Sequence, residues 1–526
     1  MRIWTGRAGS GKTTAILREI AALSEKGEGR QILLVPELNS HLMERRLAAA
    51  THNHGARTAE VLTFSRLADR VFSEVGGLAQ QMLTPAGQLL TLQEAARRVQ
   101  GGLSAWKGLA DKPELLQEAL RLIDECKTCA VAPETLFAAA EESEDAVLAE
   151  KLSDLAQILT AYERLCEESL PDPRDRLTHL RDRLAESHTL DGAAVYLDGF
   201  LGFTVQESAV VDAMLAAGVP LSAAVTCDTD YPEIFLTGCK TVQKLTRMAK
   251  HHNQTVERIE LGESKVARPA GLAALERESL LPVRTPQESA DGVRLYEAAS
   301  PFDECEHAAA YIRRKVRDEG ARCRDFVVAA RDIEPYSAFL AMAMARYDIP
   351  VFLAEKPDLL SRPPMALVTN ALEAVRNHFR YEDLFSCLKT GLAGLDWDEI
   401  DKLENYVLTW NIRGGAWERE WTEHPDGYGL SIDENAKAQL AELNTLRKRA
   451  IAPFSALREA LAGEQPAGDC VRALYAFLLA VDAPQRMTDR AAGHEQAGRL
   501  QLADEYRQLW EILVSAMEQF AWVCGD

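Results

Sequence analysis

The residues best suited to chemistry lie near the amino terminus, where the stretch GRAGSGKT occupies positions 6–13. Its spacing fits the phosphate-binding pattern G-x-x-x-x-G-K-[ST]. Glycines let backbone N–H groups wrap a polyphosphate, and the first turn of a following helix carries a partial positive charge. A chance glycine-rich turn is the alternative. Because the stretch follows an apolar strand and opens a helix, we expect the phosphates of ATP to be bound by Gly6, Arg7, Ala8, Gly9, Ser10, Gly11, Lys12, Thr13 and Thr14.

Asp198 is the second candidate group, because it ends the apolar run AAVYL at positions 193–197. A carboxylate at the end of a buried strand can hold Mg²⁺ through water beside a phosphate loop, with the hydroxyl of Thr13 as a direct ligand. The alternative role is a turn-forming aspartate. We expect the metal role, since the loop is present. The next residue is Gly199, where hydrolysing motor ATPases usually carry a glutamate that activates water, so no residue is assigned as catalytic.

Short apolar runs alternate with helical patterns along the first part of the chain. Strands are expected over 2–6, 31–37, 60–64, 193–200 and 221–228, and a helix over about 12–26. This alternation predicts a parallel α/β sheet. Residues 84–187 are rich in Ala, Leu, Glu and Arg and predict a helical insertion. Two further strands are expected at 293–300 and 325–331, with a helix between them.

These patterns predict five segments. Residues 1–83 and 188–265 form a first α/β domain, interrupted by the insertion at 84–187. A proline-containing, polar linker covers 266–290, and a second α/β domain starts over 291–370. Residues 371–526 form a helical insertion that we expect to be truncated, because no closing strand follows it.

Composition limits the kinds of partner. Lys and Arg total 59 and Asp and Glu total 80, so the net charge is −21, which argues against coating nucleic acid through bulk charge. A local basic groove or a basic partner remains possible. The basic runs 313–315 and 447–449 are expected on solvated helix faces. No apolar run reaches the ~18 residues of a membrane span and no signal peptide is present, so we expect a cytoplasmic chain without a membrane partner.

The order of four stretches resembles the UvrD-like superfamily 1 helicases, which are P-loop NTPases built from RecA-like sheets with large helical insertions. Those stretches are GRAGSGKT, LLVPE (33–37), VLTFSRLADRVF (61–72) and VYLDGFLGFTVQE (195–207). Two later stretches are similar to one branch, the AddB family, which is the B subunit of the bacterial ATP-dependent helicase/deoxyribonuclease. They are DFVVAARDIEPY (325–336) and LDWDEIDKLENYVLTWNIRGGAWEREW (395–421).

The resemblance covers the N-terminal half of that family and implies a function. It implies a heterodimer with an AddA-type helicase–nuclease that resects double-strand DNA breaks, binds single strands and duplex ends, and recognises Chi for recombinational repair. ATP and Mg²⁺ are the implied cofactors. The nuclease and its [4Fe–4S] cluster are implied only for the C-terminal half, which this sequence does not cover. Trp410, Trp417 and Trp421 could stack on bases, although such clusters more often form core.

The departures from active helicases imply slow hydrolysis. Superfamily 1 motors read D-E-x-Q-D where this chain reads Asp198-Gly199-Phe200-Leu201-Gly202, and the Gly-Asp-x-x-Gln pattern is absent around 225–230. No N-Y-R-S-like segment supplies an arginine finger. We therefore expect a protein that binds ATP and hydrolyses it slowly. An active helicase, a small-molecule P-loop kinase and a helical scaffold with a vestigial loop are the alternatives.

Overall fold

A computed structural model describes residues 1–51, 58–262, 266–278, 289–353 and 359–525. The chain forms two compact units. The first combines Met1–Val266 with Pro363–Asp526, and the second is Ala267–Arg362.

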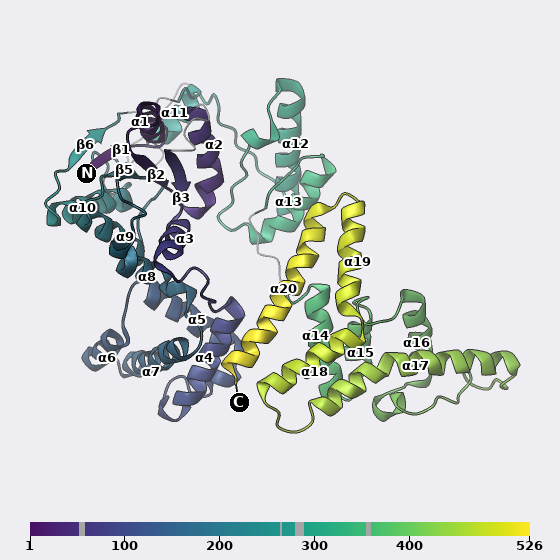
Figure 1. The fold of residues 1–526 in the computed structure, drawn as a ribbon. Helices are drawn as coiled ribbons and strands as arrows, with labels where there is room; N and C mark the ends of the chain where they lie inside the picture. The colour runs from purple at the N-terminus through teal and green to yellow at the C-terminus, as the bar shows by residue number, and fades with distance from the viewer. Residues whose placement is uncertain (52–57, 263–265, 279–288, 354–358, 526) are drawn as a thin grey trace. The chain divides into compact units, whose positions relative to one another are not determined.

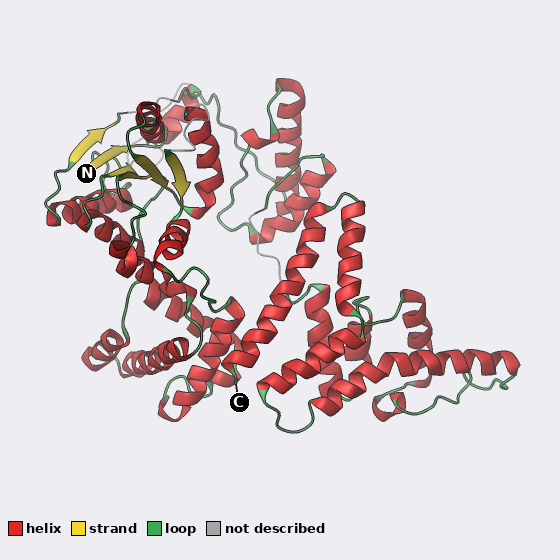
Figure 2. Ribbon diagram, in the orientation of Figure 1, coloured by secondary structure: helices red, strands yellow, loops and turns green. Residues whose placement is uncertain are grey.

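The first unit contains a six-stranded sheet in which every strand pair is parallel (Figures 1 and 2). The strand order is β3-β2-β4-β5-β1-β6. This confirms the α/β fold class. The bounds are β1 Arg2–Gly6, β2 Arg30–Leu34, β3 Ala59–Leu62, β4 Ala193–Leu197, β5 Leu221–Thr226 and β6 Glu257–Glu260.

Helices bury both faces of this sheet, which explains why its central strands are nearly continuous apolar runs. One face packs against α1 and α2, and the other against α3, α8, α9 and α10. The five strands expected from sequence within residues 1–228 are all present; β1 has the expected bounds, the other four are shorter by one to three residues, and β6 had not been predicted. The helix bounds are α1 Lys12–Lys26, α2 Ser40–Ala50, α3 Phe64–Val75, α8 Arg176–Arg183, α9 Val205–Ala216 and α10 Leu236–His251.

Between α3 and β4 the chain is helical, and prolines occupy the first turn of α4, α5 and α6. Its core is centred on Tyr162, which is fully buried. The Tyr162 hydroxyl and the Gln88 side-chain amide both donate to buried Asp172, at 2.9 and 2.7 Å. The bounds are α4 Pro85–Val99, α5 Pro113–Thr128, α6 Pro133–Glu142 and α7 Ala146–Glu168.

The residues after 362 are also helical and share one hydrophobic core. Gln519 on α20 contacts the helical insertion, because its side-chain oxygen accepts from the backbone N–H of Thr84 at 2.9 Å. The bounds are α14 Pro363–Arg376, α15 Tyr381–Leu388, α16 Trp397–Trp410, α17 Glu434–Ala460, α18 Ala467–Ala480, α19 Ala483–Gln496 and α20 Leu500–Val523.

In this helical region the structure bears out one sequence interpretation, the packing role of the tryptophans, and contradicts another, the solvated position of Arg447. Trp417 and Trp421 are buried, and Trp410 donates its indole N–H to the carbonyl of His424 at 3.0 Å, so the three tryptophans serve packing and do not form a base-stacking surface. Arg447 had been expected on a solvated face but is buried. Its guanidinium donates to the Trp417 carbonyl at 2.6 Å, and that bond compensates for the lost hydration.

The second unit contains α11 Ala270–Glu278, α12 Pro301–Glu319 and α13 Glu334–Arg346. The strands predicted over 293–300 and 325–331 do not form, because their segments have no neighbouring strand in the described part of the chain. Helix α11 lies within the predicted linker 266–290, and residues 279–288 of that linker lie outside the described residues. No helix in the described residues is both long and apolar enough to cross a membrane.

Candidate nucleotide-binding site

The predicted phosphate loop joins the carboxyl end of β1 to the amino end of α1. Gly9 and Gly11 have φ angles of +79° and +96°, which favour glycine, and Gly11 caps α1 without a side chain. Ala8 and Gly9 are exposed at the loop tip, and Thr14 is exposed on α1. Ser10 is buried, and its hydroxyl finds no hydrogen-bond partner among the described residues. The loop therefore leaves the N-terminal N–H groups of α1 open to an anion.

Lys12 is folded over this loop. Its ammonium donates to the carbonyl oxygens of Gly6 and Arg7, both at 2.8 Å. Burial lowers the pKa of Lys12, and the negative charge of Asp198 opposes that shift in part. Asp198 thus offsets only part of the cost of burying this cation, and a polyphosphate would add negative charge beside it.

Asp198 lies directly after β4, and its backbone N–H donates to the Leu34 carbonyl at 3.1 Å. The residue is 5% exposed, and burial raises the pKa of its carboxyl group, while hydrogen bonds from the Thr13 hydroxyl and the Gly199 N–H oppose that change. The two predicted metal residues, Thr13 and Asp198, therefore lie near enough for Thr13 to act on the Asp198 carboxyl group. Arg46 on α2 is close enough to act on the Asp198 charge.

Sequence reasoning missed the contact between Arg7 and the loop after β5. The Arg7 guanidinium forms an ion pair with Asp228, with Nε 2.5 Å from Oδ2, and its centre lies 4.9 Å from the Tyr231 ring. Asp228 had been placed only at the end of the strand expected over 221–228 and in the stretch 225–230 that lacks a helicase motif. Nothing in the sequence pairs positions 7 and 228, because only the adjacency of β1 and β5 brings them together.

A cavity of about 390 Å³ lies beside Asp198, at the carboxyl ends of β2, β3 and β4. Three of the stretches that carry the helicase resemblance meet there. Its lining is Val35, Pro36, Glu37, Thr63, Phe64, Ser65, Leu177, Gly199, Phe200, Leu201, Gly202 and Glu207. Ligands of open α/β sheets bind at this carboxyl edge.

Gly199 borders the cavity with a φ of +85°. A Cβ atom at this position would lie 3.2 Å from Asn39 Nδ2 and 3.3 Å from Pro36 Cδ. The backbone conformation at position 199 favours glycine. The absence of the glutamate found in motor ATPases is therefore accompanied by a backbone conformation that a glutamate would adopt only with strain.

The residues fit ATP with Mg²⁺. The loop supplies N–H groups and an ammonium for phosphates, and the paired Thr13 hydroxyl and Asp198 carboxylate are oxygen donors of the kind Mg²⁺ prefers. No cluster of three or more His, Cys, Asp or Glu side chains in the described residues is placed to hold a metal alone. Two protein oxygens are enough where phosphates and water complete the coordination of Mg²⁺. When bound, the ion would neutralise phosphate charge.

The fold and this loop define a P-loop, RecA-like α/β protein, with a parallel sheet and helical insertions. The family model described as "ADDB, N-terminal" matches residues 3–276. The chain belongs to this family. It had been predicted from the order of GRAGSGKT and the later stretches, and the match confirms it.

Curated relatives agree over the whole chain. It is 32% identical to the B subunit of the ATP-dependent helicase/deoxyribonuclease of Acetivibrio thermocellus, over 100% of this chain and 47% of the relative. The proteins of the same name from Thermoanaerobacter sp. strain X514 and Clostridioides difficile are each 30% identical, with the same coverage. The chain spans about half the length of the curated relatives it matches.

Proposed function

We propose that the chain binds ATP through residues 6–14 and one Mg²⁺ ion through Thr13 and Asp198. The observation that carries this proposal is the position of Lys12, whose ammonium is folded over the phosphate loop at 2.8 Å from two carbonyl oxygens, with the buried Asp198 carboxylate near enough to act on its charge. In a structural scaffold with a vestigial loop, no function would require Lys12 and Asp198 to lie together at the phosphate loop. Saturable, Mg²⁺-dependent ATP binding is the test.

The whole protein is, in this proposal, the helicase-like AddB component of a two-component helicase–nuclease. It works with an AddA-type helicase–nuclease on double-strand DNA ends, binds single-stranded DNA and recognises Chi during recombinational repair. Support comes from the family and from the names of the relatives. We assign the nuclease and its [4Fe–4S] cluster, in the same proposal, to the part of the whole protein that lies outside this chain, since the chain covers 47% of its relative.

The domain organisation follows the same reasoning. Residues 1–83 and 188–265 form the first RecA-like domain, 84–187 its helical insertion, and 371–526 a second insertion. Residues 291–370 begin a second RecA-like domain. Several apolar residues of the second unit are exposed, including Leu295, Val327 and Phe352. They support this assignment, because apolar side chains are expected in segments that form strands once neighbouring strands are present.

Replacing Asp198 by asparagine should remove most of the Mg²⁺ dependence of ATP binding. Asparagine keeps an acceptor for the Thr13 hydroxyl but lacks the charge that holds the ion. We expect ATP affinity to differ at least tenfold between Mg²⁺ and EDTA in the natural chain, and about twofold or less in Asp198→Asn. Asp212→Asn, a carboxylate change on α9, is the matched control. Unchanged Mg²⁺ dependence in Asp198→Asn would place the metal elsewhere.

The chain by itself should show no nuclease activity. In the described residues no group of three acidic or metal-ligating side chains gathers to form a nuclease centre, and two-metal nuclease chemistry needs such a group. Linear duplex DNA incubated with the pure chain and Mg²⁺ should remain intact. DNA degradation that co-purifies with the chain through every column would show that the chain contains a nuclease site.

A further inference from the structure

Strand β3 lies at an open edge of the sheet, where backbone hydrogen-bonding groups are available to bind another strand. Among the residues that the structure describes, β3 ends the strand order and pairs with β2 alone. Hydrogen bonds from Gln31 N–H to Thr58 O and from Val35 N–H to Leu62 O fix which residues of β3 face β2. Backbone groups alternate along a parallel strand, so the N–H and C=O groups of Ala59 and Val61 point away from the sheet.

Ala59 and Val61 are both largely buried residues at an edge that no other described strand covers. Ala59 is 9% exposed and Val61 is 6% exposed, and the described part of the chain offers their outward backbone groups no hydrogen bond. Polar backbone groups in such surroundings are normally paired. A ladder of unpaired N–H and C=O groups is the template that an added strand uses.

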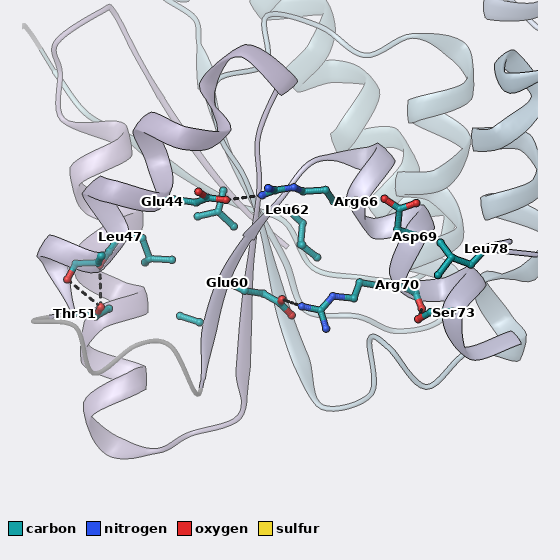
Figure 3. A pocket seen from close by; sticks show the side chains of 13 residues that line it. Glu44, Leu47, Thr51, Glu60, Leu62, Arg66, Asp69, Arg70, Ser73 and Leu78 are labelled. Carbon is teal, nitrogen blue, oxygen red and sulfur yellow. Dashed lines mark hydrogen bonds and ion pairs between the residues drawn. The ribbon is translucent and has the colours of Figure 1, made fainter. Parts of the chain in front are cut away.

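The edge lies at the floor of a groove of about 840 Å³ between α2 and α3 (Figure 3). On the α2 side the wall combines the apolar side chains of Leu47 and Ala48 with the polar side chains of Glu44 and Thr51. On the α3 side Arg66 and Arg70 extend into the groove. A strand bound here would direct alternate side chains to these two different walls.

Charge selects the occupant of this groove. Arg66 pairs with Glu44 on α2, and Arg70 pairs with Glu60 on β3 at 2.8 Å. Both arginine side chains are about half exposed, and within the described residues each has one hydrogen-bonded acceptor, although a guanidinium carries five N–H groups. Asp69, the remaining acid of the groove, is occupied by Arg176. The remaining N–H donors of Arg66 and Arg70 therefore favour an added strand that carries carboxylate side chains.

We propose that the β3 edge binds an extended segment of another protein chain by strand addition. The segment carries apolar side chains toward Leu47 and Ala48 and acidic side chains toward Arg66 and Arg70. Its backbone completes the hydrogen bonds of Ala59 and Val61. This surface is separate from the phosphate loop and does not depend on nucleotide.

The probe is a fluorescein-labelled, end-blocked peptide of alternating valine and glutamate, titrated against the full 526-residue chain. Binding in the micromolar range is expected, while the same peptide with lysine in place of glutamate should bind at least tenfold more weakly. Hydrogen exchange at the amides of Ala59 and Val61 should slow at least tenfold when the peptide is bound. No saturable binding up to millimolar peptide overturns the proposal.

Variants separate backbone pairing from side-chain contacts. Ala59→Pro removes an outward N–H and leaves the ladder with β2 intact, so peptide affinity should fall at least tenfold while ATP affinity stays unchanged. Arg66→Gln should lower peptide affinity by a similar factor, and Arg45→Gln, on α2 outside the groove, should change it less than twofold. Equal affinity in folded Ala59→Pro and Arg66→Gln overturns the proposal, as does self-association through β3 in place of peptide binding.

Discussion

ATP should bind Lys12→Ala at least tenfold more weakly than it binds the natural chain. The ammonium of Lys12 is held over the phosphate loop by two carbonyl oxygens, and burial lowers its pKa. A triphosphate replaces those weak acceptors with full negative charge. A charge-assisted contact of this kind contributes about 1.4 kcal/mol or more, which corresponds to the factor of ten. Isothermal calorimetry with Mg²⁺–ATP measures it.

Lys26→Ala is the control for this substitution. Lys26 ends the same helix and is exposed, so its replacement changes the net charge equally while leaving the loop untouched. Its ATP affinity should stay within twofold of the natural value. Equal affinity in Lys12→Ala and Lys26→Ala would show that the loop does not hold the phosphates.

Gly199→Glu should fail to create an efficient ATPase. Removing a general base costs about 10²–10⁴-fold in rate, but restoring the carboxylate here requires a φ of +85° in a residue with a Cβ atom. That conformation costs about 1–2 kcal/mol, and Pro36 and Asn39 crowd the new side chain. Gly202 also stands where motors carry a second aspartate. We expect a lower thermal midpoint and at most a small gain in turnover.

Gly218→Ala provides the comparison, because Gly218 also has a positive φ, +76°, but has no neighbour within 4 Å of its Cβ position. It should lower the thermal midpoint through backbone strain alone and leave hydrolysis unchanged. If Gly199→Glu hydrolyses ATP as fast as a motor ATPase, the missing general base alone explains the slow hydrolysis of the natural chain. The residues around position 199 would then support hydrolysis without further change.

The sequence predicted the sheet and the loop because both depend on local patterns. The phosphate loop is a contiguous motif, and α1 begins and ends where the sequence indicated, at Lys12 and Lys26. The buried strands at 31–37 and 193–200 are apolar runs, which parallel sheets require. The proximity of Thr13 to Asp198 follows once β1 and β4 belong to one sheet.

What the sequence did not predict depends on contacts between distant residues. Strand β6 is polar and exposed at the sheet edge, so it carries no apolar signal. The Arg7–Asp228 pair joins positions far apart in the chain. Arg447 looks solvated in a basic run, yet the fold provides the Trp417 carbonyl that makes its burial possible. The strands expected at 293–300 and 325–331 had apolar runs without a sheet to join.

The central claim is that the chain binds ATP with Mg²⁺ and hydrolyses it slowly. Rapid-quench analysis of radiolabelled ATP, mixed with excess chain, Mg²⁺ and single-stranded DNA, tests it most directly, with Lys12→Ala as the background. Bound ATP should remain largely intact over many seconds, at a rate far below the ~1–10³ s⁻¹ usual for enzymes. Hydrolysis at tens per second in the natural chain, absent from Lys12→Ala, would contradict the account and identify a working motor.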